Sequence, residues 1–433
     1  MNTYDICIIG GGASGMAAAI AASMANPEVR VAIAEKKGTL GKKLAATGNG
    51  RCNITNTDCS EYAKTEAFLR SIGIFTREEA EGRVYPYSGQ AEQVVSAFVS
   101  KLNELGTDIF CGETAVSVSL IASAADASEK GKTGEKNNNV NGQFVFLTEM
   151  LSGRTIASKK LIIACGGKAS PQYGTSGDGY ACAKAFGHTV TRLAPVLAPI
   201  TLESSEYDGR LLKGIRTRCT AALIKDGRQI AEERGEVQFT EEGVSGIAVF
   251  NLSRFLKIED GETLKEGMKR YSIALDLMPD YEVGSIIRLL IERQKTAGSV
   301  NLLRTIIDDR LAKAVLERAA AANLKSTGAK AVNMKTVNIS EPCDIEYIED
   351  TARALKCLTY TVTGTGGWKA AQCTAGGISL DEIDENTGES KLQSGLYFAG
   401  EILDYDGPCG GFNLQNAWMT GIKAGKDAAL DKH

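Results

Sequence analysis

The chain has 433 residues, enough on average for roughly two to three domains, and 43% of them are hydrophobic and 24% charged, as in an ordinary soluble globular protein. The net charge of −4 excludes a basic field that would attract nucleic acid or anionic lipid, and no apolar run approaches the roughly 18 residues that span a bilayer. We therefore expect neither a nucleic-acid nor a membrane partner.

Cysteine and histidine usage narrows the chemistry further. Eleven cysteines are scattered singly without a Cys-x-x-Cys pair, and no charged, cleavable leader opens the sequence, so we expect reduced thiols in a cytoplasmic protein. The only histidines are His188 and His433, which nearly excludes histidine triads and histidine metal sites, and no metal is expected. A chain of this size with so little histidine is expected to take its reactivity from a cofactor.

The first elements form a dinucleotide-binding pattern. An apolar strand over Tyr4–Ile9 precedes the turn Gly10–Gly15 (GGGASG), a helix of small residues follows, and a second strand over Val29–Glu35 ends on an acid. The first, third and sixth residues of the turn are the glycines of G-x-G-x-x-G, and Glu35 follows 20 residues after the last of them. The glycines would let the backbone approach a pyrophosphate at the helix N-terminus, and Glu35 would accept hydrogen bonds from a ribose.

A long polar loop stands where a simple NAD fold would turn into another helix. The stretch Thr47–Asn56, TGNGRCNITN, is too rich in glycine and asparagine for a helix and too polar for a core. Its backbone N–H groups and small residues suit close approach to a flat ring. Arg51 is expected to compensate negative charge, and Asn49 and Asn53 are expected to form hydrogen bonds with the carbonyls and nitrogens of the ring. Cys52 is expected to be a small packing residue and not a redox thiol.

Four stretches together, GGGASG, Glu35, GKKLAATGNGRCNITN and GRVYPYSGQAEQVV, resemble the HI0933-like (YhiN-type) FAD flavoproteins. The resemblance covers nearly the whole chain and depends on long, specific motifs. It implies FAD as the cofactor, with the polar loop running along it to the flavin ring. The family includes aminoacetone-oxidase-type enzymes and a flavin reductase of the bile-acid dehydroxylation pathway, so it spans unlike substrates.

The resemblance also implies further contacts with FAD. The backbone near Thr114–Val116 would meet the adenine, and the end of the apolar run Leu161–Ser170 would make a second close approach. Asp178 would either face the cofactor or cap a helix, and His188 is expected to be structural. The expected FAD-binding residues are Gly10, Gly12, Ala13, Ser14, Gly15, Glu35, Lys36, Lys43, Gly48, Asn49, Gly50, Arg51, Cys52, Asn53, Ala115, Val116, Ala164, Cys165, Gly166, Gly400, Glu401, Gly411, Asn413, Leu414 and Gln415.

The middle of the chain is expected to interrupt this fold. Ala122–Gly142 is polar and of low complexity, and we expect a hairpin tip without function. From Pro195, strand alternation and the hairpin signal Asp226-Gly227 predict a β-rich segment, and helical periodicity follows from Pro279.

We therefore expect an α/β fold with a discontinuous cofactor domain. A Rossmann-like FAD-binding domain of the glutathione-reductase type would cover residues 1–194 and 365–433, interrupted by a β-rich domain over 195–278 and a mainly helical domain over 279–364. The sequence shows no second strand–GxGxxG–helix unit, so NADH or NADPH would visit the flavin from solvent as a transient electron donor.

The C-terminal segment is expected to return to the cofactor. A strand over Leu396–Ala399 leads into the turn Gly400-Glu401, and the turn Gly410-Gly411 precedes the last helix. The N-terminus of that helix would stabilise the negative charge that gathers at flavin N1 and O2 on reduction. It would then clasp the ring together with the Thr47–Asn56 loop.

The expected reaction is hydride transfer between flavin N5 and a small organic substrate. NAD(P)H-linked reduction of an activated C=C, as in a bile-acid-like enone, is the leading hypothesis. It needs a proton donor, for which Tyr85, Tyr87 and Tyr405 are candidates, with aromatic packing as the alternative for each, and Arg51 completes the candidate catalytic set. The alternatives are an oxygen-dependent amine oxidase of the aminoacetone type and an FAD-bound nucleic-acid-modifying or sensor protein, which the net charge disfavours. The sequence does not indicate the oligomeric state.

Overall fold

The computed structural model describes residues 2–122, 144–259, 261–297, 302–327 and 344–430. The chain divides into two compact units, Met1–Pro195 with Ala371–His433, and Val196–Ala370. The hairpin tip expected at Ala122–Gly142 lies, beyond its first residue, outside the described residues.

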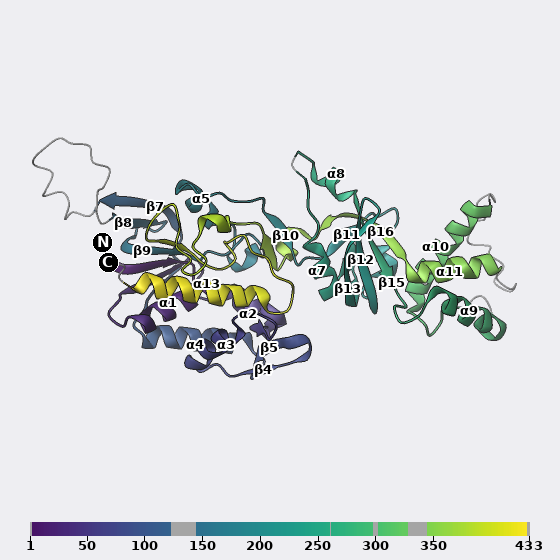
Figure 1. The fold of residues 1–433 in the computed structure, drawn as a ribbon, viewed down its shortest axis with the longest axis horizontal. Coiled ribbons are helices and arrows are strands. Elements are labelled where there is room, and N and C mark those ends of the chain that lie inside the picture. The colour runs from purple at the N-terminus through teal and green to yellow at the C-terminus, as the bar shows by residue number, and fades with distance from the viewer. Residues whose placement is uncertain (1, 123–143, 260, 298–301, 328–343, 431–433) are drawn as a thin grey trace, which may run out of the picture. The chain divides into compact units, whose positions relative to one another are not determined.

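The first unit is built on a seven-stranded sheet of order β6-β2-β1-β9-β8-β7, with β18 pairing β9 off this path (Figure 1). Strands β1, β2, β6, β9 and β18 are parallel, whereas β7 and β8 form an antiparallel extension. The strands are β1 (Asn2–Ile9), β2 (Val31–Glu35), β6 (Asp108–Cys111), β7 (Ala115–Ala122), β8 (Phe144–Met150), β9 (Thr155–Ile163) and β18 (Leu396–Phe398). The parallel β1–helix–β2 unit confirms the Rossmann-type fold expected from the N-terminal pattern.

Apolar side chains alternate along β1, so each face of this sheet has its own core. Ile6 and Ile8 belong to a buried cluster with residues of α1 (Ala13–Ala25), α4 (Ala91–Glu104) and α13 (Phe412–Ala429). Cys7 and Ile9 belong to a second cluster, which includes residues of α5 (Asp178–Ala185). Helices on both faces bury the central parallel strands.

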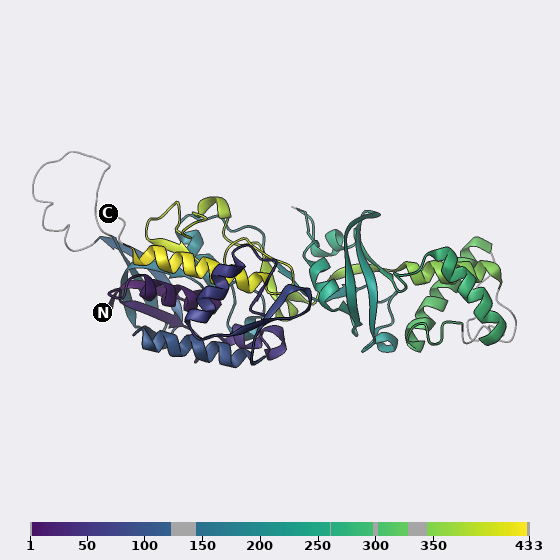
Figure 2. The ribbon, with the colours of Figure 1, turned by 60° about the horizontal axis from the view of Figure 1, so that its bottom comes forward.

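Helices α1 and α13 lie side by side, which brings the two ends of the chain together (Figure 2). Glycines permit the close approach. A Cβ added at Gly421 would lie 2.3 Å from the Ser14 carbonyl oxygen, and one at Gly425 would lie 2.0 Å from that of Ala18. Helix α13 is therefore packed closely against α1, and the N-termini of both helices lie in the same part of the first unit.

A small antiparallel sheet of order β3-β5-β4 extends the same unit. Its strands are β3 (Thr55–Asn56), β4 (Thr76–Glu78) and β5 (Arg83–Pro86). The predicted polar loop leads from α2 (Lys42–Ala46) into β3, and α3 (Tyr62–Ser71) follows. Elsewhere β10 (Ala194–Val196) pairs with β17 (Cys373–Ala375).

The second unit contains a closed barrel of order β11-β14-β13-β12-β15-β16. Its strands are β11 (Ile200–Leu202), β12 (Arg216–Lys225), β13 (Arg228–Phe239), β14 (Gly243–Ser245), β15 (Tyr271–Asp276) and β16 (Leu358–Thr365). Between β12 and β13, Asp226 and Gly227 have φ angles of 50° and 76°, the left-handed pair that a two-residue hairpin turn requires. The predicted hairpin is confirmed.

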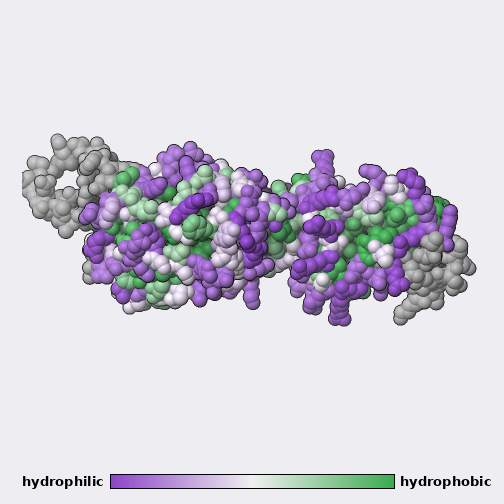
Figure 3. Space-filling view, turned by 90° about the horizontal axis from the view of Figure 1, so that it is seen from below, coloured by the Kyte–Doolittle hydropathy of each residue, from purple (hydrophilic) through white to green (hydrophobic). Residues whose placement is uncertain are grey.

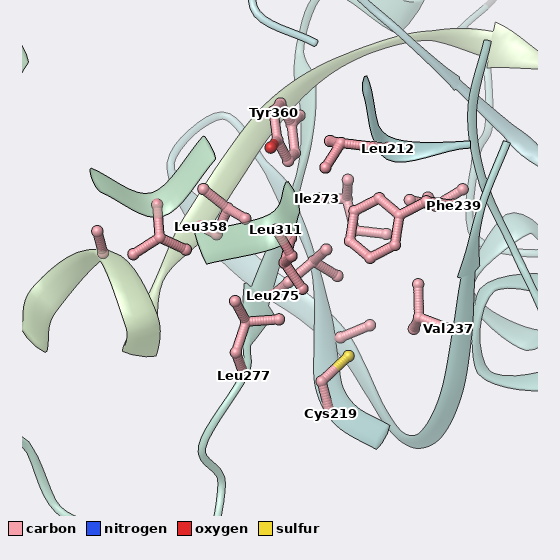
Figure 4. Close-up of a cluster of buried hydrophobic side chains, with 14 of the residues drawn as sticks. Leu212, Cys219, Val237, Phe239, Ile273, Leu275, Leu277, Leu311, Leu358 and Tyr360 are labelled. Carbon is pink, nitrogen blue, oxygen red and sulfur yellow. The ribbon is translucent and has the colours of Figure 1, made fainter. Parts of the chain in front are cut away.

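One buried cluster joins the barrel interior to the helices of this unit. Phe239, Leu275 and Tyr360 of the barrel share it with Leu311 of α10 (Asp309–Thr327) (Figure 4). The other helices are α6 (Gly209–Leu212), α7 (Ile247–Ser253), α8 (Leu264–Met268), α9 (Val283–Ala297), α11 (Ile345–Lys356) and α12 (Gly367–Ala370). The segment 279–364, expected to be mainly helical, also supplies most of β16, which closes the barrel by pairing with β11 and β15. Barrel and helices therefore lie in one unit.

One face of the molecule is predominantly polar. Hydrophilic residues cover most of the face shown in Figure 3, with hydrophobic residues interspersed among them. Among the described helices, none is long and apolar enough to cross a membrane.

Candidate functional site

The three motif glycines of the turn between β1 and α1 have two different roles. A Cβ at Gly10 would lie 2.4 Å from the Ala164 carbonyl oxygen, and one at Gly15 would lie 1.9 Å from that of Gly10, so both are needed for packing within the protein. Among the residues that the structure describes, a Cβ at Gly12 would meet nothing within 4 Å, and no side chain caps α1, which begins at the next residue. The first-turn N–H groups of α1 therefore adjoin an open stretch of backbone, which suits an anion such as a pyrophosphate.

Glu35 ends β2 beside this turn with its carboxylate held in place. Its Oε2 accepts a hydrogen bond from the Gly11 N–H (2.8 Å), and its Oε1 accepts one from the Lys37 N–H (2.7 Å). Each carboxylate oxygen can accept a second hydrogen bond. The group is therefore oriented, and each oxygen keeps a lone pair that could accept a bond from a ribose hydroxyl.

The neighbouring segments hold several other predicted contacts. Lys36 makes an ion pair with Asp178 at the start of α5 and donates to Ser176 Oγ (2.7 Å), so its charge is satisfied within the protein. After β9, Ala164 is buried, Cys165 Sγ donates to the Ile9 carbonyl (3.4 Å), and Gly166 has a left-handed φ of 73°. Ala115 and Val116 begin β7. The side chain of Val116 is exposed.

The polar loop has an unusual backbone. Gly48, Asn49, Gly50 and Cys52 all have left-handed φ angles, of 58°, 55°, 84° and 59°. The conformation explains the glycines and the asparagine, because these residues adopt it at the lowest cost. Gly48 to Arg51 are exposed, whereas Cys52 is buried and donates its N–H to the Thr47 carbonyl (3.0 Å). Burial raises the pKa of the Cys52 thiol to about 12, which suits a packing role and not a nucleophile.

Asn53 carries a buried polar atom without a partner. Its side-chain Oδ1 is buried and accepts no hydrogen bond from any of the described residues. A buried carbonyl left in this state costs about 1–3 kcal/mol unless a ligand supplies a donor. A flavin ring carries an N–H group at N3, so this atom fits the cofactor that the family resemblance implies.

Of the predicted catalytic candidates, Arg51 and Tyr85 lie together. The Arg51 guanidinium sits 4.2 Å from the centre of the Tyr85 ring, and Arg51 Nη2 lies 2.6 Å from Glu79 Oε1. The hydrogen bond with Glu79 raises the pKa of Arg51 and lowers that of Glu79, so both groups stay charged. Tyr405 comes from a different segment, the loop between β18 and α13, where its side chain is exposed.

The start of α13 adjoins the polar loop. A Cβ at Gly411, which has a φ of 107°, would lie 2.3 Å from the Thr55 carbonyl oxygen, and no side chain caps the helix. Trp418 further along α13 donates its Nε1–H to the Ile54 carbonyl (2.9 Å). Loop and helix N-terminus are therefore joined through backbone groups of the loop.

The side chains predicted at this helix start make contacts within the protein. Asn413 accepts the Gly407 N–H (2.8 Å) and donates to the Gly407 carbonyl (2.9 Å), and Leu414 packs against the core of the first unit. Gln415 is buried and accepts from Thr55 Oγ1 (2.6 Å). Since these side chains are used within the protein, the groups that these residues can offer a ligand are the backbone N–H groups of the first helical turn.

A half-buried polar network lies at the turn after β18. Lys43 Nζ lies 2.6 Å from Glu401 Oε2, and Glu401 Oε1 accepts hydrogen bonds from the Thr374 N–H (3.1 Å) and Oγ1 (2.9 Å). Thr374 Oγ1 in turn accepts the N–H groups of Lys168 and Ala169, at 2.8 and 2.9 Å. The network ties the β9 and β18 turns to α2, so the two predicted residues Lys43 and Glu401 contact one another.

Gly400, in the turn after β18, lies close to α1. A Cβ at Gly400 would lie 2.4 Å from Ser14 Oγ, and that hydroxyl donates to the Ala399 carbonyl (3.3 Å). Ala13 and Ser14 open α1, so this contact joins the β18 turn to the glycine turn.

Comparison with known proteins identifies the family. The description "HI0933-like protein Rossmann domain" matches residues 4–67 and 61–427. The chain belongs to the HI0933-like family. The resemblance inferred from the sequence motifs is confirmed.

Two named relatives align with nearly the whole length of this chain. A 3-dehydro-bile acid delta(4,6)-reductase of Clostridium scindens is 33% identical over 446 residues, with 98% of each chain covered. A ribosomal RNA dihydrouridine synthase of Escherichia coli is 28% identical over 449 residues, with 100% of each chain covered. Among solved structures, a 3-ketosteroid delta1-dehydrogenase from Sterolibacterium denitrificans is a distant likeness, with 12% identity and a TM-score of 0.49 over 99% of this chain and 100% of that one.

Several residues that hold this region together are not among the expected FAD-binding or catalytic residues. Thr55, Glu79, Thr374 and Trp418 each hold a predicted residue or the polar loop in place, through bonds that link distant parts of the chain. Thr374 and its partner Glu401 are 27 positions apart, and no local pattern records that pairing. His188, expected to be structural, is buried between Glu382 Oε2 (3.0 Å from Nδ1) and Ser390 Oγ (2.7 Å from Nε2).

Proposed function

We propose that this chain binds FAD and reduces a C=C bond conjugated to a carbonyl in a small organic substrate, with NADH or NADPH as the electron donor. FAD supplies hydride transfer when bound. The observation that carries the cofactor part is the open backbone at Gly12, at the uncapped start of α1 and beside the oriented Glu35 carboxylate. The partnerless Oδ1 of Asn53 supports a ring with a donor at the polar loop.

The names of two relatives support reduction as the direction of the reaction. The bile-acid enzyme is named a delta(4,6)-reductase, and forming dihydrouridine from uridine also adds hydrogen across a C=C conjugated to a carbonyl. The substrates differ greatly in size and polarity, but the bond that is reduced is of one chemical class. We therefore propose this bond type for the present chain and, with the relative of higher identity, a bile-acid-like enone as the first substrate to test.

Reduction of such a bond needs a proton on the carbon that does not receive the hydride. We propose Tyr85 as the donor, with Tyr405 as the second candidate. The Arg51 guanidinium over the Tyr85 ring would stabilise the phenolate that remains after the proton leaves, and Glu79 keeps that guanidinium in position. Loss of the Tyr85 hydroxyl would then slow turnover of the enone without preventing reduction of the bound cofactor.

The deciding experiment is anaerobic mixing of the FAD-loaded protein with NADH and, separately, with NADPH, followed by absorbance at the flavin band. Bleaching by either donor, reversed by an added enone, is the expected result. No bleaching by either, together with bleaching by an aminoketone and recovery in oxygen, would replace this proposal with the amine-oxidase alternative. A protein that does not take up FAD would refute the cofactor assignment.

A nucleic-acid substrate is the second candidate, because the Escherichia coli relative is named for ribosomal RNA. The net charge of −4 argues against it for this chain, since nonspecific affinity for RNA comes mainly from basic side chains. We propose a small-molecule substrate and a cytoplasmic location. A gel shift with ribosomal RNA fragments at low salt tests this directly, and retention of the RNA would favour the second candidate.

A further inference from the structure

The antiparallel pair β4–β5 has a face of aromatic and cationic side chains, of which the proposed reaction uses only one end. The strand register pairs Arg77 with Tyr85, and a hydrogen bond from the Tyr87 N–H to the Phe75 carbonyl (2.8 Å) extends the pairing by one step. Alternate residues of a strand share a face, so these four side chains lie on the same face of the pair. Together with Arg51, which stacks on Tyr85, they are called the hairpin face below.

The outer end of the hairpin face consists of two large rings in solvent. Phe75 is 69% exposed and Tyr87 is 68% exposed, whereas Val84 on the opposite face of β5 is fully buried. Isolated exposed apolar side chains are common, but two exposed rings at one cross-strand pair offer two faces on which a planar molecule can stack.

The middle of the hairpin face has an excess of positive charge. Arg51 Nη2 and Arg77 Nη2 lie 2.6 Å and 3.3 Å from the same oxygen, Glu79 Oε1. Two guanidinium groups therefore share one carboxylate, which leaves one positive charge uncompensated in this group. Guanidinium edges are well suited to binding phosphate oxygens in pairs.

We propose that the hairpin face is the docking site of the reduced nicotinamide dinucleotide that supplies electrons to the flavin. The adenine ring stacks on Phe75 and Tyr87, and the diphosphate lies against Arg77 and Arg51. Arg51 belongs to the polar loop, so the nicotinamide end is directed toward that loop. The nicotinamide gives up a hydride to the flavin and leaves as the oxidised cation, while a proton from solvent completes the reduction.

This inference rests on the proposed function, because it requires a nicotinamide donor. It also explains how such a donor could bind in a chain whose sequence shows no second G-x-G-x-x-G unit. A face with one surplus charge and a single stacking position predicts weak, reversible binding, as suits a donor that must leave after each turnover.

The test is the rate of anaerobic flavin reduction as a function of NADPH and of NADH concentration, measured by stopped flow on the FAD-loaded protein. Phe75→Ala is expected to raise the Kd of the donor about tenfold, because losing one base–aromatic stacking contact weakens binding by about this factor. Arg77→Gln is expected to raise it by a similar factor. Neither variant is expected to change the limiting rate of reduction by more than about twofold, because neither residue belongs to the polar loop.

Matched variants separate stacking and charge from general damage. Tyr87→Phe keeps the ring and is expected to leave the Kd unchanged, and Arg77→Lys keeps the charge and is expected to recover part of the loss. Reduction by dithionite and FAD content should be the same in every variant. Unchanged Kd values in both Phe75→Ala and Arg77→Gln would overturn the docking site while leaving the proposed function intact.

Two other outcomes are also decisive. If neither dinucleotide reduces the wild-type protein, the donor part of the proposed function and the docking site both fail. If Phe75→Ala loses affinity for a single-stranded RNA oligonucleotide but keeps its Kd for NADPH, the hairpin face is a nucleic-acid platform and the inference is overturned.

Discussion

Replacing single glycines of the first turn by alanine separates ligand binding from folding. At Gly15, the added Cβ would lie 1.9 Å from the Gly10 carbonyl oxygen, a backbone atom that cannot move without distorting the turn. At Gly12, the Cβ would meet nothing within 4 Å, and the backbone angles of −80° and −168° are extended ones that alanine adopts freely. The two substitutions add the same methyl group three residues apart.

The structure sets opposite expectations for the two variants. Gly15→Ala should destabilise the protein by about 1–3 kcal/mol, the usual cost of forcing an extra methyl into a packed site. Gly12→Ala should change the free energy of unfolding by less than about 1 kcal/mol, because lost entropy of the unfolded chain roughly offsets the poorer helix cap. Its methyl group would instead occupy the space that a pyrophosphate needs, so FAD affinity should fall at least tenfold, or about 1.4 kcal/mol.

Urea unfolding of the FAD-free proteins measures the first quantity, and quenching of FAD fluorescence on titration measures the second. Wild-type FAD affinity in Gly12→Ala would refute the placement of the pyrophosphate at this turn. A Gly12→Ala protein that is as unstable as Gly15→Ala would show that the space at Gly12 is not open in solution.

Three further predictions follow from the same region. Tyr85→Phe should lower turnover of an enone by about 10²–10⁴-fold while anaerobic flavin reduction by the donor stays within twofold of wild type; equal loss of both rates would argue against a proton-donor role. Trp418→Phe should destabilise the protein by about 1–3 kcal/mol in urea, since the Ile54 carbonyl loses its buried donor, and an unchanged midpoint would contradict this. Asp178→Asn tests the ion pair with Lys36 through its pH dependence. Burial raises the pKa of Asp178, but hydrogen bonds and the charge of Lys36 together outweigh burial, so the pKa is lowered in the folded protein. The ion pair therefore stabilises the fold above the ordinary carboxyl pKa of 3.8, and this stabilisation is lost as the pH falls through the lower pKa of the folded state. The difference between wild type and Asp178→Asn in urea should therefore be present at pH 7 and shrink toward pH 3; a constant difference would assign it to another cause.

The sequence by itself determined the parts of this protein that depend on neighbouring residues. The glycine turn, the helix after it and the acid at Glu35 are coded within one short stretch, because strand, turn and helix preferences are local. The hairpin at Asp226-Gly227 is equally local, since both residues tolerate the left-handed backbone that the turn imposes. The family motifs of the polar loop predict that it lies beside a cofactor, and glycine or asparagine stands at three of its four left-handed positions, Cys52 being the fourth.

The tertiary structure alone decided which distant residues meet. Trp418 and Ile54 are 364 positions apart and Lys43 and Glu401 are 358 apart, and no local preference records such a pairing. The position of β16 is a case of the same kind: it follows a helical segment in sequence, yet it closes the barrel because the remaining strands leave two edges that only another strand can satisfy. Backbone preference fixes what a segment becomes, whereas the burial of apolar faces and the pairing of polar groups across the chain fix where it goes.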